Sequence, residues 1–264
     1  MLLTHPLDLH EIRSNIASHL DPIDLAACVL VSHDWNDSFT PQLYKTVILL
    51  KRGLCNESIE RNKHHIQSLH VQRSACDDLS STLLHDRLVL TVTASSSLTH
   101  LALDHNWIDD HRVQALADAL WINTTLLALD LCHNPLGDDV IQALAEALKI
   151  NTTLTILDLG STSSGPEVAL AFSEVLKINV TLRTLALDGN QIHDEGARAL
   201  AEALKINSTL TSLSLQDNSI GPDGAQALSS ALKTNSTLTT LDLESWTLFD
   251  AEECLCLNSI HDSG

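Results

Sequence analysis

The apolar residues in the second half of the chain recur with a fixed period. Near copies of one segment begin at Ser95, Asn123, Asn151, Asn179, Asn207 and Asn235, so each copy is 28 residues long. A fixed period of this length is typical of a solenoid, in which each unit stacks only on its neighbours.

The first half of each unit has the pattern of a short strand. In the unit that begins at Asn123, the spacing LxxLxL is formed by Leu126, Leu129 and Leu131. Asn134 comes next, and its side chain can hydrogen-bond neighbouring backbone from inside the turn. We expect a strand over the leucines and a turn at the asparagine.

The second half of each unit changes to a helical period, with Ala143, Leu144, Ala147 and Leu148 on one face. Strands in a sheet lie about 4.8 Å apart, whereas packed helices need roughly 8 to 10 Å. Stacked units should therefore fan out on the helix side, and the sheet should become concave.

The units resemble leucine-rich repeats of the ribonuclease-inhibitor type. The resemblance covers residues 95–264 and implies an α/β fold, a right-handed horseshoe of alternating strands and helices with six 28-residue units. The third unit has Thr162 and Ser164 where others have asparagine and an aliphatic residue, which predicts a looser turn. The last unit is atypical, with Trp246 in place of asparagine, and reads as a terminal cap or as a chain cut short.

The asparagine that begins each regular unit follows the preceding helix, so we expect it to adopt a left-handed C-cap conformation. The same asparagines stand in NTT, NVT and NST triplets, which fit the glycosylation sequon. Their recurrence once per unit favours a structural role over modification.

Alternate strand residues face opposite sides of a sheet, so the variable positions of LxxLxLxx should line the concave face. Acidic residues are frequent there. The residues that we expect to contact a partner are Asp104, His105, Asp130, His133, Asp158, Arg183, Asp188, Asp242 and Glu244. This composition favours a protein with lysine or arginine on its docking surface, bound less tightly as salt is added.

Residues 1–45 do not follow the repeat and predict three short helices. Leu9, Ile12, Ile16 and Leu20 share one helical face, and Asp21 followed by proline marks the start of the next helix. A third short helix would carry Trp35.

This segment resembles the F-box family in one ungapped register. The matching residues are Glu11, Ile12, Ile16, Leu20, Asp24, Leu25, Val31 and Trp35. The resemblance implies docking onto a Skp-type adaptor and hence onto a cullin-based ubiquitin ligase, with these residues divided between that interface and the core of the module. The alternative is a helical cap that covers the apolar end of the solenoid.

Residues 46–94 connect the two parts. Ile66, Leu69 and Val71 repeat the strand rhythm and predict a degenerate first repeat, followed by a longer convex side or loop. Of the three segments of the chain, only this one has a net positive charge. We interpret its basic residues as contacts between domains rather than as a nucleic-acid site, because they are not interleaved with aromatic residues for stacking on bases.

Charge limits the classes of partner. The formal net charge is −19, and residues 95–264 contribute −16 of it. This argues against nucleic acid and anionic membranes and for a basic or neutral protein, unless the charge serves only solubility. The sequence lacks a secretory leader and a run of 18 apolar residues, and we expect a cytoplasmic or nuclear protein.

We expect no enzymatic activity and no cofactor. No phosphate loop, nucleophile elbow or HExxH motif is present. His105, Cys132 and His133 should approach one another on adjacent strands, but they lack a local ligand motif, and we predict no metal site there.

The favoured hypothesis is a substrate-recognition subunit of an SCF-type cullin-RING ubiquitin ligase, which binds the adaptor through the F-box and a protein substrate through the acidic concave face. The alternative is a leucine-rich-repeat binding module, as in a sensor, an inhibitor or a GTPase regulator, with an N-terminal helical cap and no ligase role.

Overall fold

A computed structural model describes residues 45–49, 64–71, 96–106, 108 and 110–243. The predicted F-box residues, Glu244 and Trp246 lie outside the described residues, so their predicted roles stay predictions. Within the described part, no helix is long and apolar enough to cross a lipid bilayer.

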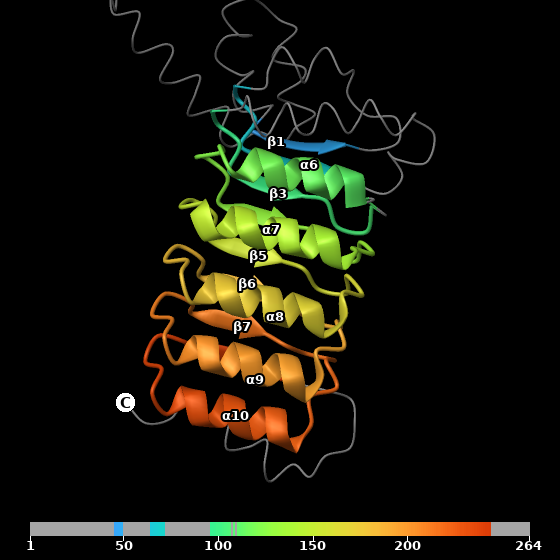
Figure 1. Cartoon of the computed structure of the whole chain (residues 1–264). Coiled ribbons are helices and arrows are strands. Elements are labelled where there is room, and N and C mark those ends of the chain that lie inside the picture. The colour runs from blue at the N-terminus through green and yellow to red at the C-terminus, as the bar shows by residue number, and fades with distance from the viewer. Residues whose placement is uncertain (1–44, 50–63, 72–95, 107, 109, 244–264) are drawn as a thin grey trace, which may run out of the picture.

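The described strands form one parallel sheet in chain order (Figure 1). They are β1 (Thr46–Leu49), β2 (Ser68–Val71), β3 (His100–Ala102), β4 (Ala128–Asp130), β5 (Ile156–Asp158), β6 (Thr184–Ala186), β7 (Ser212–Ser214) and β8 (Thr240–Asp242). From β3 onward the register advances by 28 residues per strand, so Leu101, Leu129 and Leu157 are neighbours across the sheet. The sequence period is thus the structural period.

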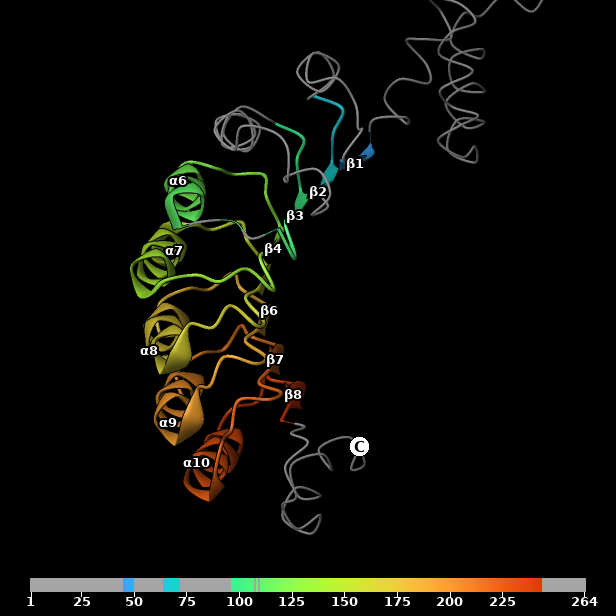
Figure 2. The ribbon, with the colours of Figure 1, turned by 90° about the vertical axis from the view of Figure 1, so that its right-hand side faces the viewer.

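The helices are α6 (Asp110–Leu120), α7 (Asp138–Ile150), α8 (Gly165–Leu176), α9 (His193–Leu204) and α10 (Pro222–Leu232). Figure 2 shows all of them on one side of the sheet, as an outer arc around the strands, whose own arc opens away from the helices. The expectation of a concave sheet and a convex helical side is therefore confirmed.

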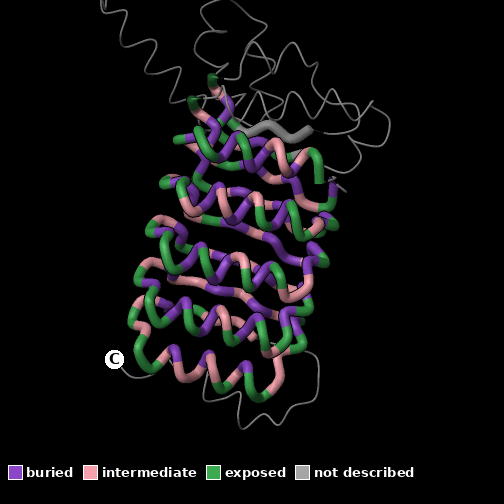
Figure 3. Tube along the Cα trace, viewed as in Figure 1, coloured by how far each residue is buried: buried purple, intermediate pink, exposed green. Residues whose placement is uncertain are grey.

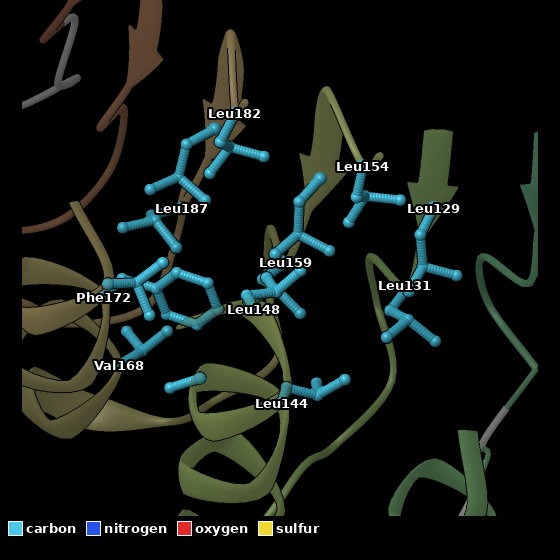
Figure 4. Close-up of a cluster of buried hydrophobic side chains, with 14 of the residues drawn as sticks. Leu129, Leu131, Leu144, Leu148, Leu154, Leu159, Val168, Phe172, Leu182 and Leu187 are labelled. Atoms are coloured by element: carbon cyan, nitrogen blue, oxygen red, sulfur yellow. The ribbon is translucent and has the colours of Figure 1, made fainter. Parts of the chain in front are cut away.

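Leucines from each strand and residues from each helix fill the space between the two layers. Figure 4 shows part of this cluster, and Figure 3 marks the buried positions along the backbone. Leu126, Leu129 and Leu131 of one unit are at most 1% exposed, and Leu144 and Leu148 of its helix are fully buried. The small alanines beside them let the helices lie close together. One continuous core therefore runs through the stacked units.

The turn asparagines link successive units from inside. Asn134 is fully buried, and its Nδ2 donates to the backbone oxygen of Leu103 in the preceding unit at 2.9 Å and to that of Leu131 at 3.0 Å. Its Oδ1 accepts from the amide of Ile108 at 2.9 Å. The predicted role of this residue is confirmed.

The third unit forms a buried, hydrogen-bonded turn without an asparagine. The Thr162 hydroxyl lies 3.0 Å from the Leu159 oxygen, 2.9 Å from the Ser164 hydroxyl and 2.9 Å from Oδ1 of Asn190. Thr162 is fully buried, so the prediction of a looser turn is wrong in its hydrogen bonding. Two hydroxyl groups take the place of one amide.

The asparagine at the start of each unit forms a second ladder. Asn151 is extended, with φ −61° and ψ 128°, so the predicted left-handed cap is wrong at this residue. Its Nδ2 donates to Leu120 of the preceding unit at 2.9 Å, and its Oδ1 accepts from the amide of Leu154 at 2.8 Å. The amide nitrogen that would carry a glycan is thus buried and hydrogen-bonded in the folded chain.

The sheet begins before residue 95. Ile66 and Leu69 are buried, and β2 pairs with β3, as the degenerate first repeat predicts. The earlier strand β1 pairs with β2 and was not expected, because nothing in its sequence repeats the unit pattern.

Candidate protein-binding site

The concave face is built from the outer residues of the short strands. In β4 the middle residue, Leu129, is buried, while Ala128 and Asp130 are half-buried on the opposite face. The same alternation holds in β6 and β7. Every unit therefore presents two strand residues, followed by the residues of its turn.

Two aspartates lie side by side at the centre of this face. Asp130 and Asp158 are register partners on β4 and β5. The Oδ1 of Asp130 accepts from the amide of Cys132 at 2.9 Å, and that of Asp158 accepts from the amide of Gly160 at 2.8 Å. Each carboxylate is thus oriented by the backbone at the end of its own strand.

Burial and neighbouring charges raise the pKa values of two groups at this place, the Asp158 carboxyl and the Cys132 thiol. Burial raises the pKa of the Asp158 carboxyl, the hydrogen bond from Gly160 opposes this, and the charges of Asp130 and Asp188 raise it further. Burial and a hydrogen bond to Asp130 also raise the pKa of the Cys132 thiol. Ligand atoms of Asp130, Cys132 and Asp158 lie within 4.8 Å of one another, and a protonated thiol is a poor nucleophile.

Because folding raises the pKa of Asp158, the folded chain holds this proton more tightly than the unfolded chain does. Ionisation of Asp158 therefore costs stability as the pH rises from about 4, the usual value for an aspartate, through the raised folded value. We expect Asp158→Asn to stabilise the fold at pH 7 by less than about 1 kcal/mol, and the gain to shrink as the pH is lowered toward about 4. Thermal unfolding followed by circular dichroism at several pH values measures this. The control is Asp217→Asn, which removes an exposed carboxylate, and an equal, pH-independent gain in both variants would contradict the prediction.

Two histidines flank the acidic cluster. The rings of His105 and His133 are stacked, with centroids 4.0 Å apart and planes 11° from parallel. Both residues are exposed and have φ near 55°, which places them at the tips of successive turns. The expectation that positions one unit apart meet on this face is confirmed for this pair.

The acids of the later units are bonded to their neighbours. Asp188 Oδ1 accepts from the Gln216 amide at 2.9 Å and from the Ser214 hydroxyl. The side chain of Gln216 donates to Asp242. Asp188 and Asp242 are therefore hydrogen-bonded to side chains of neighbouring strands. The earlier units, which hold Asp104, Asp130 and Asp158, differ in also carrying the two stacked histidines.

Arg183 lies outside this cluster. It is exposed, and its guanidinium donates to the backbone oxygen of Thr209 at 2.9 Å. The threonines in its column form a ladder, in which the hydroxyl of Thr155, for example, donates to the oxygen of Leu127 at 2.9 Å. Side chains of this column therefore donate hydrogen bonds to the backbone of the neighbouring unit, and the predicted partner contact of Arg183 stays a prediction.

The first residue of each strand from β3 to β8 was missing from the predicted site. These residues are His100, Ala128, Ile156, Thr184, Ser212 and Thr240. Ile156 is 42% exposed and the nearby Leu127 is 40% exposed, so the acidic cluster has apolar neighbours. The alternation of strand residues that predicted Asp130 and Asp158 on the concave face also predicts this column there. The predicted site omitted it because the prediction emphasised charged residues.

The match to a leucine-rich-repeat family model agrees with the fold. The leucine-rich-repeat family model matches residues 94–117, 123–145, 179–201 and 207–229, and the F-box-like family model matches residues 10–49. No curated protein matches the chain. Among solved structures, the chain is similar to leiomodin-1 actin-binding site 2, with 27% identity, a TM-score of 0.48 and coverage of 56% of this chain and 83% of that one. It is also similar to the tropomodulin C-terminal domain of Caenorhabditis elegans, with 15% identity, a TM-score of 0.49 and coverage of 55% and 89%.

The repeated strand, turn and helix define a leucine-rich-repeat protein. An F-box-like match precedes the leucine-rich-repeat matches, so the chain resembles the proteins that combine an F-box with leucine-rich repeats. This combination is that of a protein-interaction module.

Proposed function

We propose that the chain is the substrate-recognition subunit of an SCF-type cullin-RING ubiquitin ligase. The observation that carries the proposal is the F-box-like match at residues 10–49, which precedes the repeat matches that begin at residue 94. The F-box would bind a Skp-type adaptor, and the concave face would hold the substrate. The chain would act in the cytoplasm or nucleus.

The mechanism would be proximity rather than chemistry on this chain. Linking an adaptor-binding and a substrate-binding module in one protein raises the effective concentration of the substrate near the ubiquitin carrier. The cluster of Asp104, Asp130 and Asp158 favours a substrate with lysine or arginine on its docking surface. Ile156 and Leu127 supply apolar contact beside it. No covalent step, nucleic acid or membrane is part of the proposal.

Adaptor binding is the first test. The purified chain is mixed with a Skp-type adaptor and analysed by size-exclusion chromatography beside a Leu25→Asp, Trp35→Ala double variant. We expect the parent chain to co-elute and the double variant not to, because the F-box resemblance assigns both side chains to the adaptor interface or to the core of the module. Loss of a large aromatic side chain from an interface costs about 2 kcal/mol or more, and a new charge adds to that. Circular dichroism must show that the variant keeps its fold.

An Asp130→Asn, Asp158→Asn variant is the matched control, because it alters the concave face and should keep adaptor binding. If the parent chain does not bind the adaptor, the ligase proposal is wrong. The alternative would then be favoured, in which the N-terminal helices cap a leucine-rich-repeat binding module that acts as a sensor, an inhibitor or a GTPase regulator.

A further inference from the structure

A second surface with the features of a binding site lies on the convex side, between α7 and α8. An open groove of about 440 Å³ separates the two helices there. Its lining includes Asp138, Asp139, Glu167, Leu170, Ala171 and Glu174. The two helices run side by side in Figure 1, on the opposite side of the sheet from the concave face.

The groove contains one leucine that breaks the repeat. Leu170 is 37% exposed on α8. The equivalent positions one unit before and after it are Gln142 and Arg198, and the next units outward have Gln114 and Gln226. Four of the five helices thus carry a polar side chain at this position, and the fold does not need an apolar one there.

The core beneath the groove also departs from the repeat. Phe172 is fully buried where the neighbouring units have Leu144 and Leu200. Figure 4 shows its ring beside Val168 and Leu187, under α8.

The groove is lined by four carboxylates and one lysine, Lys149, so its net charge is negative. Lys149 is bound to Glu146 at 2.7 Å and Glu174 to Lys177 at 2.6 Å. Within the described part of the chain, no ion pair or hydrogen bond engages the side chains of Asp138, Asp139 or Glu167.

Acids in the first turn of a helix are favourable by themselves, and α9 and α10 also have them. The groove differs in combining such carboxylates with an exposed leucine in a hollow between two helices.

We propose that this groove docks a basic segment of a partner protein, with an apolar side chain on Leu170 and Ala171 and flanking lysines or arginines on Asp139 and Glu167. A second copy of the chain fits less well, because its formal net charge of −19 would bring further acid to these carboxylates. The groove lies on the opposite side of the sheet from the concave face. The repeats would therefore hold two protein partners at once, one on each side, besides the adaptor of the proposed function.

The test uses the full chain and a fluorescein-labelled helical peptide of leucines and arginines, in about 150 mM salt, where nonspecific attraction between exposed charges is weakened. Leu170→Gln introduces the residue type of the other units and leaves the net charge unchanged. We expect it to weaken binding about tenfold, because burial of a leucine side chain is worth about 1.5 kcal/mol or more. Asp139→Asn with Glu167→Gln should also weaken binding, whereas Asp130→Asn with Asp158→Asn, which removes the same charge from the concave face, should not.

A photoreactive group in place of the central leucine of the peptide should label α7 and α8 when the products are mapped by mass spectrometry. The proposal is overturned if the parent chain does not bind the peptide, if Leu170→Gln binds as the parent does, or if the concave-face variant loses as much affinity. Sedimentation velocity tests whether the groove instead binds a second copy of the chain. A dimer that Leu170→Gln dissociates would overturn the proposal and assign the groove to that second copy. Leu170→Gln should still bind the Skp-type adaptor, so failure of this proposal is distinguishable from failure of the ligase proposal.

Discussion

Phe172→Ala is expected to lower the free energy of unfolding by about 3 to 5 kcal/mol. The Phe172 side chain is fully buried at the middle of the core, between α8 and the sheet. Truncation to alanine removes most of its buried apolar surface and leaves a cavity that the neighbouring leucines cannot fill without moving. Urea unfolding followed by circular dichroism measures the change.

Phe172→Leu is the matched control, because leucine fills the equivalent position in the units on either side. We expect it to cost less than about 1.5 kcal/mol. A loss as large as that of the alanine variant would mean that the site depends on the ring itself and that the units are not interchangeable there. An alanine variant as stable as the parent chain would contradict the assignment of Phe172 to the core.

Asn190→Ala is expected to cost about 2 to 4 kcal/mol, because each buried polar group left without a partner costs about 1 to 3 kcal/mol. Asn190 is fully buried. Its Nδ2 donates to the Leu159 oxygen at 2.8 Å and to the Leu187 oxygen at 3.1 Å, and its Oδ1 accepts from the Thr162 amide at 3.0 Å. The alanine variant removes hydrogen bonds to backbone groups of two units at once. The measurement is again urea unfolding, and because units contact only their neighbours, the transition should also broaden as the coupling between the two halves weakens.

Two further variants test this explanation. Asn190→Asp keeps the acceptor oxygen but loses both donors and buries a charge, so it should be at least as destabilising as alanine at pH 7. Gln226→Ala, on the exposed side of α10, should change stability by no more than about 0.5 kcal/mol. An Asn190→Ala variant within that range of the parent chain would show that water or a rearranged turn satisfies the abandoned groups.

The strand and helix of each unit could be predicted because both depend on local periods, and five further copies repeated the pattern of Leu126, Leu129 and Leu131. The prediction was wrong for single residues whose side chains hydrogen-bond to another unit. Asn151 was expected to be left-handed because it follows a helix, yet its side chain reaches Leu120, a residue 31 positions earlier. The same limit applies to Thr162, whose hydroxyl meets Asn190 only once the units are stacked.

The candidate site shows the same division. The strand positions that line the concave face follow from alternation, and the stacking of His105 on His133 follows from the period. Which carboxylates are already engaged does not follow, because the bond from the Gln216 amide to Asp188 depends on the side chain of one unit and the backbone of the next. The groove between α7 and α8 was not predicted either. Its signal was a single leucine, Leu170, in a column of polar residues.

The asparagine ladders make the number of units a variable that evolution can change at low cost. Each hydrogen bond of a ladder, which we call a rung, joins an asparagine side chain to backbone one period away, as from Asn179 to Asn151 and from Asn207 to Asn179. Every regular unit therefore presents to the next unit the same backbone groups that the previous unit presents to it. Removing one whole unit, or duplicating one, would rejoin equivalent partners and leave no rung open. A recombination event in the middle of the gene could therefore lengthen or shorten the concave face by one strand and bring a different set of side chains opposite the same partner.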